Sequence, residues 1–249
     1  MSPRAPRAIG FDYGGTLVEI GYPAEELVEA GERLLADLGV LEPSGLPRGE
    51  SFGPLVDRRV DELVASAHRQ DPLREVEIFD LYQKVLNGLL GRELSRDEVR
   101  QAAYQLQEPW AVAISVDPQA LAVLEALRRR GVRLGLLSNA PYPARTMRRM
   151  MDGQGITQRF DEIVLSSEIG WRKPAPQAFL ALLGALGVPA QDTWFVGDEL
   201  EADIEGAAAV GMPALLRPGR RPPGSSAIAL GSWEELLQRL DREAPPTPA

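Results

Sequence analysis

The chain has 249 residues, 44% of them hydrophobic and 25% charged, which is the composition of a globular protein with one or two domains. Acidic residues outnumber basic ones by 36 to 27, and the net charge of −9 argues against partners that are nucleic acids or anionic membranes. The absence of cysteine excludes disulfides, thiolate catalysis and cysteine-ligated metals.

No apolar run reaches the length of a membrane span, and the N-terminal segment lacks the apolar core of a signal peptide. We therefore expect a cytoplasmic protein without a membrane partner. Only Lys84 and Lys173 are lysines among the 27 basic residues, so the place of each lysine in the chain is informative. The sequence carries no feature that selects a monomer or a dimer.

The first predicted element is a buried strand over residues 7–12. Its apolar residues lead directly to Asp12, and two adjacent glycines, Gly14 and Gly15, follow almost at once. Ligands of open α/β sheets bind at the carboxyl ends of strands, so this position suits a nucleophile or a metal ligand. The glycines allow backbone groups to approach a phosphate or a cation. Taken alone, the segment also fits a purely structural turn.

Residues 18–110 are predicted to be helical throughout, with no strand. Apolar residues recur at helical spacing in four segments, over 23–38, 55–67, 76–90 and 95–107. The fourth segment begins with Ser95 and Glu98 at the spacing of a capping box, which marks the start of a helix.

From Asp117 onward, predicted strands and helices alternate. Asp117 followed by proline is a favourable helix start. The predicted strands cover 132–137, 162–165, 193–197 and 213–216, and the predicted helices cover 118–130, 143–153, 176–186, 201–210 and a last segment after Ser232.

This alternation predicts parallel βαβ units in a doubly wound sheet, and the first strand needs that sheet to be buried. We therefore predict an α/β fold whose core combines residues 1–17 and 111–249. Residues 18–110 are then an all-helical domain inserted after the first strand.

Three of the predicted parallel strands end in a polar residue, namely Asp12, Ser138 and Asp198. Parallel strands bring their carboxyl ends to one edge of the sheet, so these side chains should lie close together. Asp203 adds a carboxylate at the start of the next helix, and this number of oxygen ligands suits Mg²⁺. Lys173, in a proline-stiffened loop, is expected to balance the charge of a phosphate and to keep Asp12 ionised.

With these residues, the sequence resembles the haloacid dehalogenase superfamily of hydrolases. Four motifs occur in the order of that family: Asp12-Tyr-Gly-Gly-Thr16, Ser138 after an apolar strand, Lys173 in an Arg-Lys-Pro setting, and Gly197-Asp-Glu-Leu-Glu-Ala-Asp203. The resemblance covers nearly the whole chain and implies a Rossmann-like core. It also implies that residues 18–110 are the helical, C1-type cap found after the first motif in one large branch.

The resemblance implies a role for each matching residue. Asp12 would be the nucleophile that accepts a phosphoryl group, assisted in catalysis by Ser138 and Lys173. Asp203 would support the metal or the lysine. The implied metal ligands are Asp12, the Gly14 backbone carbonyl, Asp198 and Asp203, and the implied phosphate-binding residues are Thr16, Ser138, Asn139 and Lys173.

The sequence departs from the family at Gly14. Most phosphatases of the family carry a second aspartate there, which protonates the leaving group and then activates water. General acid–base catalysis is typically worth about 10²–10⁴-fold in rate, so an alkyl phosphate would turn over slowly here. A non-acid at this position also resembles branches that cleave carbon–phosphorus or carbon–halogen bonds. The phosphonate branch uses a lysine of the cap, for which Lys84 is the candidate.

We therefore expect a Mg²⁺-dependent hydrolase that acts on a small phosphorylated metabolite through an aspartyl-phosphate on Asp12. A phosphonatase or dehalogenase is one alternative. A weakly active member of the family that binds a phosphorylated ligand or partner is the other. The full set of motif residues argues against a pure binding protein, whereas Gly14 keeps that alternative open.

Overall fold

The computed structural model describes residues 6–219 and 227–243. The described residues form two compact units. The first, here called the sheet unit, consists of the described parts of Met1–Ile20, Ser115–Ala140 and Met151–Ala249. The second, here called the helical unit, consists of Gly21–Ile114 and Pro141–Met150. Residues 141–150 thus join the helical unit, although the sequence analysis groups them with the sheet.

The sheet unit is built on a five-stranded parallel sheet, which confirms the predicted α/β fold. Its strands lie in the order β5-β4-β1-β6-β7, so the chain reverses its direction of travel across the sheet at β1. Such a reversal is the usual place for a ligand site. The strands are β1 (Ala8–Phe11), β4 (Arg133–Ser138), β5 (Glu162–Leu165), β6 (Thr193–Gly197) and β7 (Ala214–Leu216).

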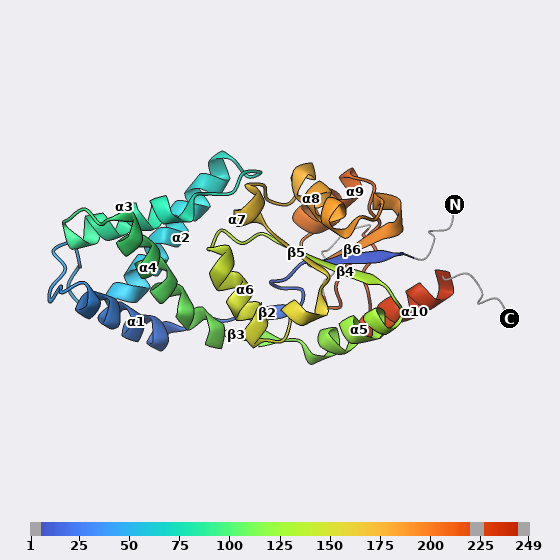
Figure 1. Ribbon diagram of the computed structural model, residues 1–249, viewed down its shortest axis with the longest axis horizontal. Helices are drawn as coiled ribbons and strands as arrows, with labels where there is room; N and C mark the ends of the chain where they lie inside the picture. The colour runs from blue at the N-terminus through green and yellow to red at the C-terminus, as the bar shows by residue number, and fades with distance from the viewer. Residues whose placement is uncertain (1–5, 220–226, 244–249) are drawn as a thin grey trace. The chain divides into compact units, whose positions relative to one another are not determined.

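Helices cover both faces of this sheet, with α8 and α9 over one face and α5 and α10 over the other (Figure 1). Phe179 and Leu182 of α8 pack against the sheet, and a Cβ on Gly10 would lie 2.8 Å from a methyl carbon of Leu182. Glycine in β1 therefore permits close packing of this helix. The helices of the unit are α5 (Pro118–Arg129), α7 (Ser166–Ile169), α8 (Pro176–Leu186), α9 (Gly206–Ala209) and α10 (Trp233–Glu243).

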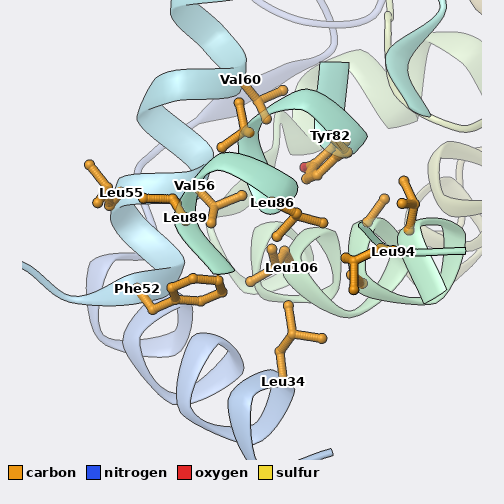
Figure 2. Close-up of a cluster of buried hydrophobic side chains, with 14 of the residues drawn as sticks. Leu34, Phe52, Leu55, Val56, Val60, Tyr82, Leu86, Leu89, Leu94 and Leu106 are labelled. Carbon is orange, nitrogen blue, oxygen red and sulfur yellow. The ribbon is translucent and has the colours of Figure 1, made fainter. Parts of the chain in front are cut away.

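The helical unit has a hydrophobic core of its own (Figure 2). The side chains of Leu34, Phe52, Leu86 and Leu106 meet there, one from each of its four long helices. These helices are α1 (Ala24–Asp37), α2 (Phe52–Gln70), α3 (Ile78–Leu90) and α4 (Arg96–Gln107), and α6 (Ala144–Gly153) adds residues up to Met150. The capping box predicted at Ser95 is present. The helices therefore bury enough apolar surface to form a separate core.

Short elements depart from the prediction. Residues 18–110 are not helical throughout, because Val18–Ile20 forms β2, which pairs with β3 (Ile114–Val116). Three residues are too few to show the alternation that marks a strand. The predicted helix over 201–210 is divided into a π-helical turn, η4 (Leu200–Glu205), and α9. Among the described residues, three 3₁₀ turns complete the elements: η1 (Glu108–Val112), η2 (Thr157–Arg159) and η3 (Ala190–Asp192).

Within 6–219 and 227–243, no helix combines the length and the apolar character needed to cross a membrane.

Candidate active site

Asp12 lies immediately after β1, at the carboxyl edge of the sheet. Its backbone N–H donates to the carbonyl of Val196 on β6 at 2.9 Å, which fixes the turn against the neighbouring strand. Its Oδ1 lies 2.5 Å from Lys173 Nζ, and the residue is only 6% exposed. Strand pairing of Phe11 with residues of both β4 and β6 therefore delivers one carboxylate to the middle of the sheet edge.

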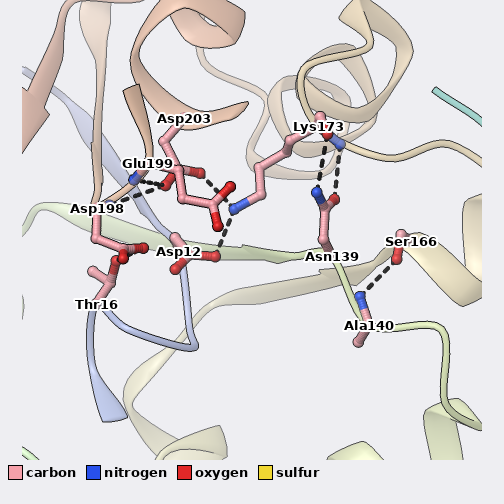
Figure 3. Close-up of polar contacts among 9 residues, drawn as sticks. All are labelled: Asp12, Thr16, Asn139, Ala140, Ser166, Lys173, Asp198, Glu199 and Asp203. Atoms are coloured by element: carbon pink, nitrogen blue, oxygen red, sulfur yellow. Dashed lines mark hydrogen bonds and ion pairs between the residues drawn. The ribbon is translucent and has the colours of Figure 1, made fainter. Parts of the chain in front are cut away.

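Lys173 bridges two carboxylates in the interior of the sheet unit (Figure 3). Its Nζ lies 2.5 Å from Asp12 Oδ1 and 2.6 Å from Asp203 Oδ1. Burial lowers the pKa of this ammonium, but the charges of Asp12 and Asp203 outweigh burial and raise the pKa above its ordinary value. Lys173 is therefore held in its charged form.

Asp203 uses both of its carboxylate oxygens. Oδ1 accepts from Lys173, and Oδ2 accepts from the backbone N–H groups of Asp198 and Glu199, each at 3.0 Å. The π-helical turn η4 brings Asp203 back over the end of β6, where a Cβ on Gly197 would lie 2.3 Å from Asp203 Cγ. Glycine before Asp198 is thus required for this approach, and π turns are frequent at functional sites.

Asp198 faces the first motif from the end of β6. Its Oδ1 accepts from Thr16 Oγ1 at 3.4 Å. Gly15 has φ of 74°, and a Cβ there would lie 2.6 Å from Asp198 Oδ2. Gly14, by contrast, is not among the glycines with positive φ, and a Cβ there would meet only Ile20 Cδ1 within contact range, at 3.3 Å. Of the two glycines, Gly15 is the one that the turn requires.

The carboxylates of Asp12, Asp198 and Asp203 fit a cation site. Each offers one oxygen, and these oxygens all lie within 4.8 Å of one another. Burial raises the pKa of Asp12 to about 7 against the pull of Lys173, and the charges of Asp203 and Asp198 add to the rise. A divalent cation would offset the effect of burial and the repulsion from the other two carboxylates, and would keep Asp12 ionised. Because Asp203 already accepts three hydrogen bonds, Asp12 and Asp198 are the better placed ligands.

The other predicted site residues, Ser138 and Asn139, lie at the end of β4. Ser138 is buried on the strand next to β1. The Asn139 side chain contacts the backbone of Lys173, donating from Nδ2 to the carbonyl at 2.9 Å and accepting at Oδ1 from the N–H at 2.8 Å. The structure thus brings Asp12, Thr16, Lys173, Asp198 and Asp203 together directly, with Asn139 attached through Lys173.

Two residues that the sequence analysis did not select support this edge of the sheet. Ser166 Oγ accepts from the N–H of Ala140 at 2.7 Å and so holds the turn after Asn139. The N–H of Glu199 is one of the donors to Asp203. Ser166 follows β5 directly, so the pattern of polar residues at strand ends could have identified it. Nothing in the sequence pattern indicates a backbone donor.

Comparison with known proteins identifies the family of the chain. Residues 6–211 match the haloacid dehalogenase-like hydrolases. The chain is 32% identical to a phosphoglycolate phosphatase of Rhodospirillum rubrum, over 95% of this chain and 90% of that protein. It is also 32% identical to a phosphoglycolate phosphatase of Cupriavidus necator, over 94% of this chain and 90% of that protein.

Solved structures show the same fold. A 2-haloacid dehalogenase from Pseudomonas syringae superposes with a TM-score of 0.68 at 22% identity, over 95% of this chain and 99% of that one. A haloacid dehalogenase-type phosphatase from Thermococcus onnurineus superposes with a TM-score of 0.61 at 23% identity, over 96% of this chain and 99% of that one. At these identities the likeness concerns the fold alone. The family match over residues 6–211 shows that the chain belongs to the haloacid dehalogenase-like hydrolase family and is a hydrolase.

Proposed function

We propose that the chain is a Mg²⁺-dependent phosphatase that hydrolyses a small phosphorylated metabolite through an aspartyl-phosphate on Asp12. The observation that supports this most is the arrangement of Asp12 and Lys173. Lys173 holds one carboxylate oxygen of Asp12, while the second oxygen points away from Lys173 (Figure 3). A carboxylate with one oxygen fixed and the other presented is suited to nucleophilic attack.

In the proposed first step, the presented oxygen of Asp12 attacks phosphorus, and the bond from phosphorus to the leaving oxygen breaks. Lys173 stays on the other oxygen and balances charge, while Ser138 donates to a phosphoryl oxygen and the Thr16 hydroxyl turns from Asp198 to donate to another. In the second step, water attacks phosphorus and the Asp12 carboxylate is released. Mg²⁺ held by Asp12, Asp198 and the Gly14 carbonyl would neutralise charge on the transferred group.

The substrate is constrained by the absence of a carboxylate at Gly14. An alkoxide leaving group needs a proton, whereas a phenolate or carboxylate departs without one. We therefore propose that esters with good leaving groups, such as aryl and acyl phosphates, are hydrolysed fastest. Phosphoglycolate, named for the two relatives above, is a small alkyl phosphate and is the first metabolite to test.

We also propose that the helical unit is the cap that selects the substrate. Most of it, Gly21–Ile114, is inserted between β1 and β4 in the sequence, after the first motif. Lys84, the candidate for Schiff-base chemistry in a phosphonatase, is an exposed residue of α3. We therefore favour phosphate esters over phosphonates.

The proposal is tested by a substrate screen with and without Mg²⁺. Phosphoglycolate, acetyl phosphate, an aryl phosphate, a phosphonate and a 2-haloacid are each supplied to the wild type and to Asp12→Asn. We expect Mg²⁺-dependent release of phosphate from the esters, lost in the variant. Turnover confined to the phosphonate or the haloacid would favour the alternative enzymes. Ester binding without turnover would favour the weakly active binding protein.

A further inference from the structure

Asn139 makes a paired contact with the backbone of one residue. Its amide donates to the carbonyl of Lys173 and accepts from the N–H of the same residue, at 2.9 and 2.8 Å (Figure 3). This exchange of two hydrogen bonds resembles one pair of a strand ladder. It joins the end of β4 to the loop between α7 and α8. Asn139 and Lys173 are 34 positions apart in the chain.

The pair matters because Lys173 depends on its backbone for its reach. The lysine side chain is long and flexible, yet its Nζ must stay within 2.6 Å of both Asp12 and Asp203. Fixing the Lys173 backbone from both sides of its Cα removes the motion to which that geometry is most sensitive. Displacements of about 1 Å at a reacting group can cost about 10²-fold in rate.

We infer that Asn139 is a positioning residue for Lys173, rather than a substrate-binding residue as its place beside Ser138 suggests. Its effect on phosphate chemistry would pass through Lys173 Nζ. The kinetic part of this inference rests on the proposed phosphatase function, whereas the structural part stands by itself.

The chain has a built-in reporter for the structural part. Lys84 and Lys173 are its two lysines, so protein labelled with ¹⁵N-lysine gives two backbone amide signals. The Lys173 amide is the donor to Asn139, and Lys84 lies within helix α3 and serves as the internal reference. Hydrogen exchange of the two signals therefore measures the contact directly, with no substrate present.

Three variants test the inference. Asn139→Ala removes both hydrogen bonds. We expect the Lys173 amide to exchange about tenfold faster, which is the change that corresponds to one net hydrogen bond. The exchange rate of the Lys84 amide should not change. Asn139→Asp keeps the acceptor and loses the donor, so an intermediate exchange rate is expected. Ser166→Ala is the matched control, because it removes the bond to the N–H of Ala140 in the same turn without deleting either atom of Asn139 that contacts Lys173.

The kinetic readout is kcat and KM for an aryl phosphate. We expect Asn139→Ala to lower kcat about 10–100-fold with little change in KM, and Asn139→Asp to recover part of the loss. Unchanged Lys173 exchange in Asn139→Ala, equal acceleration in Ser166→Ala, or unchanged kcat despite faster exchange would each overturn the positioning role. A wild type that hydrolyses no phosphate ester, but shows the expected exchange pattern, would reject the phosphatase proposal while supporting the contact.

Discussion

Lys173 Nζ lies 2.6 Å from Asp203 Oδ1, and Asp203 is itself held by two backbone N–H groups at its other oxygen. This buried pair connects the third and fourth motifs and sets the position from which Lys173 reaches Asp12. We therefore expect Asp203 to act on the site mainly through the lysine, and Asp198 mainly through the proposed Mg²⁺. The two acids are expected to differ when each is replaced.

Replacing Asp203 should disturb stability as well as activity. In Asp203→Asn, Lys173 keeps one carboxylate partner, Asp12. Both oxygens of Asp203 accept hydrogen bonds, so the NH₂ group of the asparagine must replace one acceptor and face either the Lys173 ammonium or the two backbone N–H donors. Loss of a hydrogen bond to a charged group in the interior costs about 1–3 kcal/mol. We expect the variant to unfold at a lower temperature, which calorimetry measures. We also expect its turnover to be at least about tenfold slower, which phosphate release measures. A variant with wild-type thermal stability would contradict this role for Asp203.

Replacing Asp198 should instead affect the cation. Asp198→Asn keeps the size of the side chain and its acceptor for Thr16 but removes the charge. We expect the affinity for Mg²⁺ to fall by about tenfold or more, with a smaller effect on thermal stability than in Asp203→Asn. Titration calorimetry with Mg²⁺ alone measures this without a substrate. Equal Mg²⁺ affinity in wild type and variant would remove Asp198 from the metal site.

A carboxylate introduced at Gly14 should supply the missing acid. The backbone there does not have positive φ, and the one atom of the described residues that an added Cβ would meet is Cδ1, the end of the Ile20 side chain, at 3.3 Å. Gly14→Asp is therefore expected to fold and to raise kcat/KM for an alkyl phosphate about tenfold or more, and less for an aryl phosphate. Gly14→Asn is the matched control, because it has the same shape without the acid. An equal gain in both variants would show that the effect is not proton transfer.

A buried acid of the helical unit makes stability depend on pH. Asp57 of α2 is 5% exposed and accepts from Trp110 Nε1 at 3.3 Å. Burial, and then the charge of Asp61, raise the pKa of Asp57 from 3.8 to about 6, opposed by its hydrogen bonds from Trp110 and Tyr22. The folded state therefore binds the proton of the Asp57 carboxyl more tightly than the unfolded state does. The stability that this proton adds is fully present below pH 3.8 and is lost as pH rises through 6.

We therefore expect Asp57→Asn to stabilise the protein above pH 6, by on the order of 1–3 kcal/mol, and to have little effect near pH 4. Urea unfolding followed at pH 4 and at pH 8 measures this difference. Glu62→Gln, at an exposed position of the same helix, provides the control for removing one acidic charge. A gain for Asp57→Asn that is the same at both pH values would contradict a raised pKa.

Much of the sheet unit follows from the sequence, because its signals are local. A buried strand that ends at Asp12, and another that ends just before Asp198, are visible as apolar runs that stop at an acid. The alternation of elements then brings these ends to one edge, since parallel strands share their direction. The resemblance in motifs predicted that Lys173 belongs to the site, and the structure places it between Asp12 and Asp203.

The remaining features depend on contacts that no local pattern records. The π turn at Leu200–Glu205 carries Asp203, which contacts Lys173 and the N–H group that follows Gly197, and neither contact is visible in any local pattern. The strand β2 is too short to have a period, and its partner β3 is almost a hundred residues away in the chain. The pairing of Asn139 with the Lys173 backbone is equally invisible, because side-chain contacts between distant loops are set by the folded structure.

The most direct test of the proposed chemistry is a rapid-quench experiment with an aryl phosphate and Mg²⁺. With a good leaving group, phosphoryl transfer to Asp12 needs no acid, whereas hydrolysis of the aspartyl-phosphate lacks the base that a carboxylate at Gly14 would provide. We therefore predict a burst of about one phenolate per chain, followed by slow turnover, with the phosphoryl group on the peptide that contains Asp12. Linear phenolate release without a phosphorylated Asp12 peptide, and with turnover retained in Asp12→Asn, would contradict the mechanism.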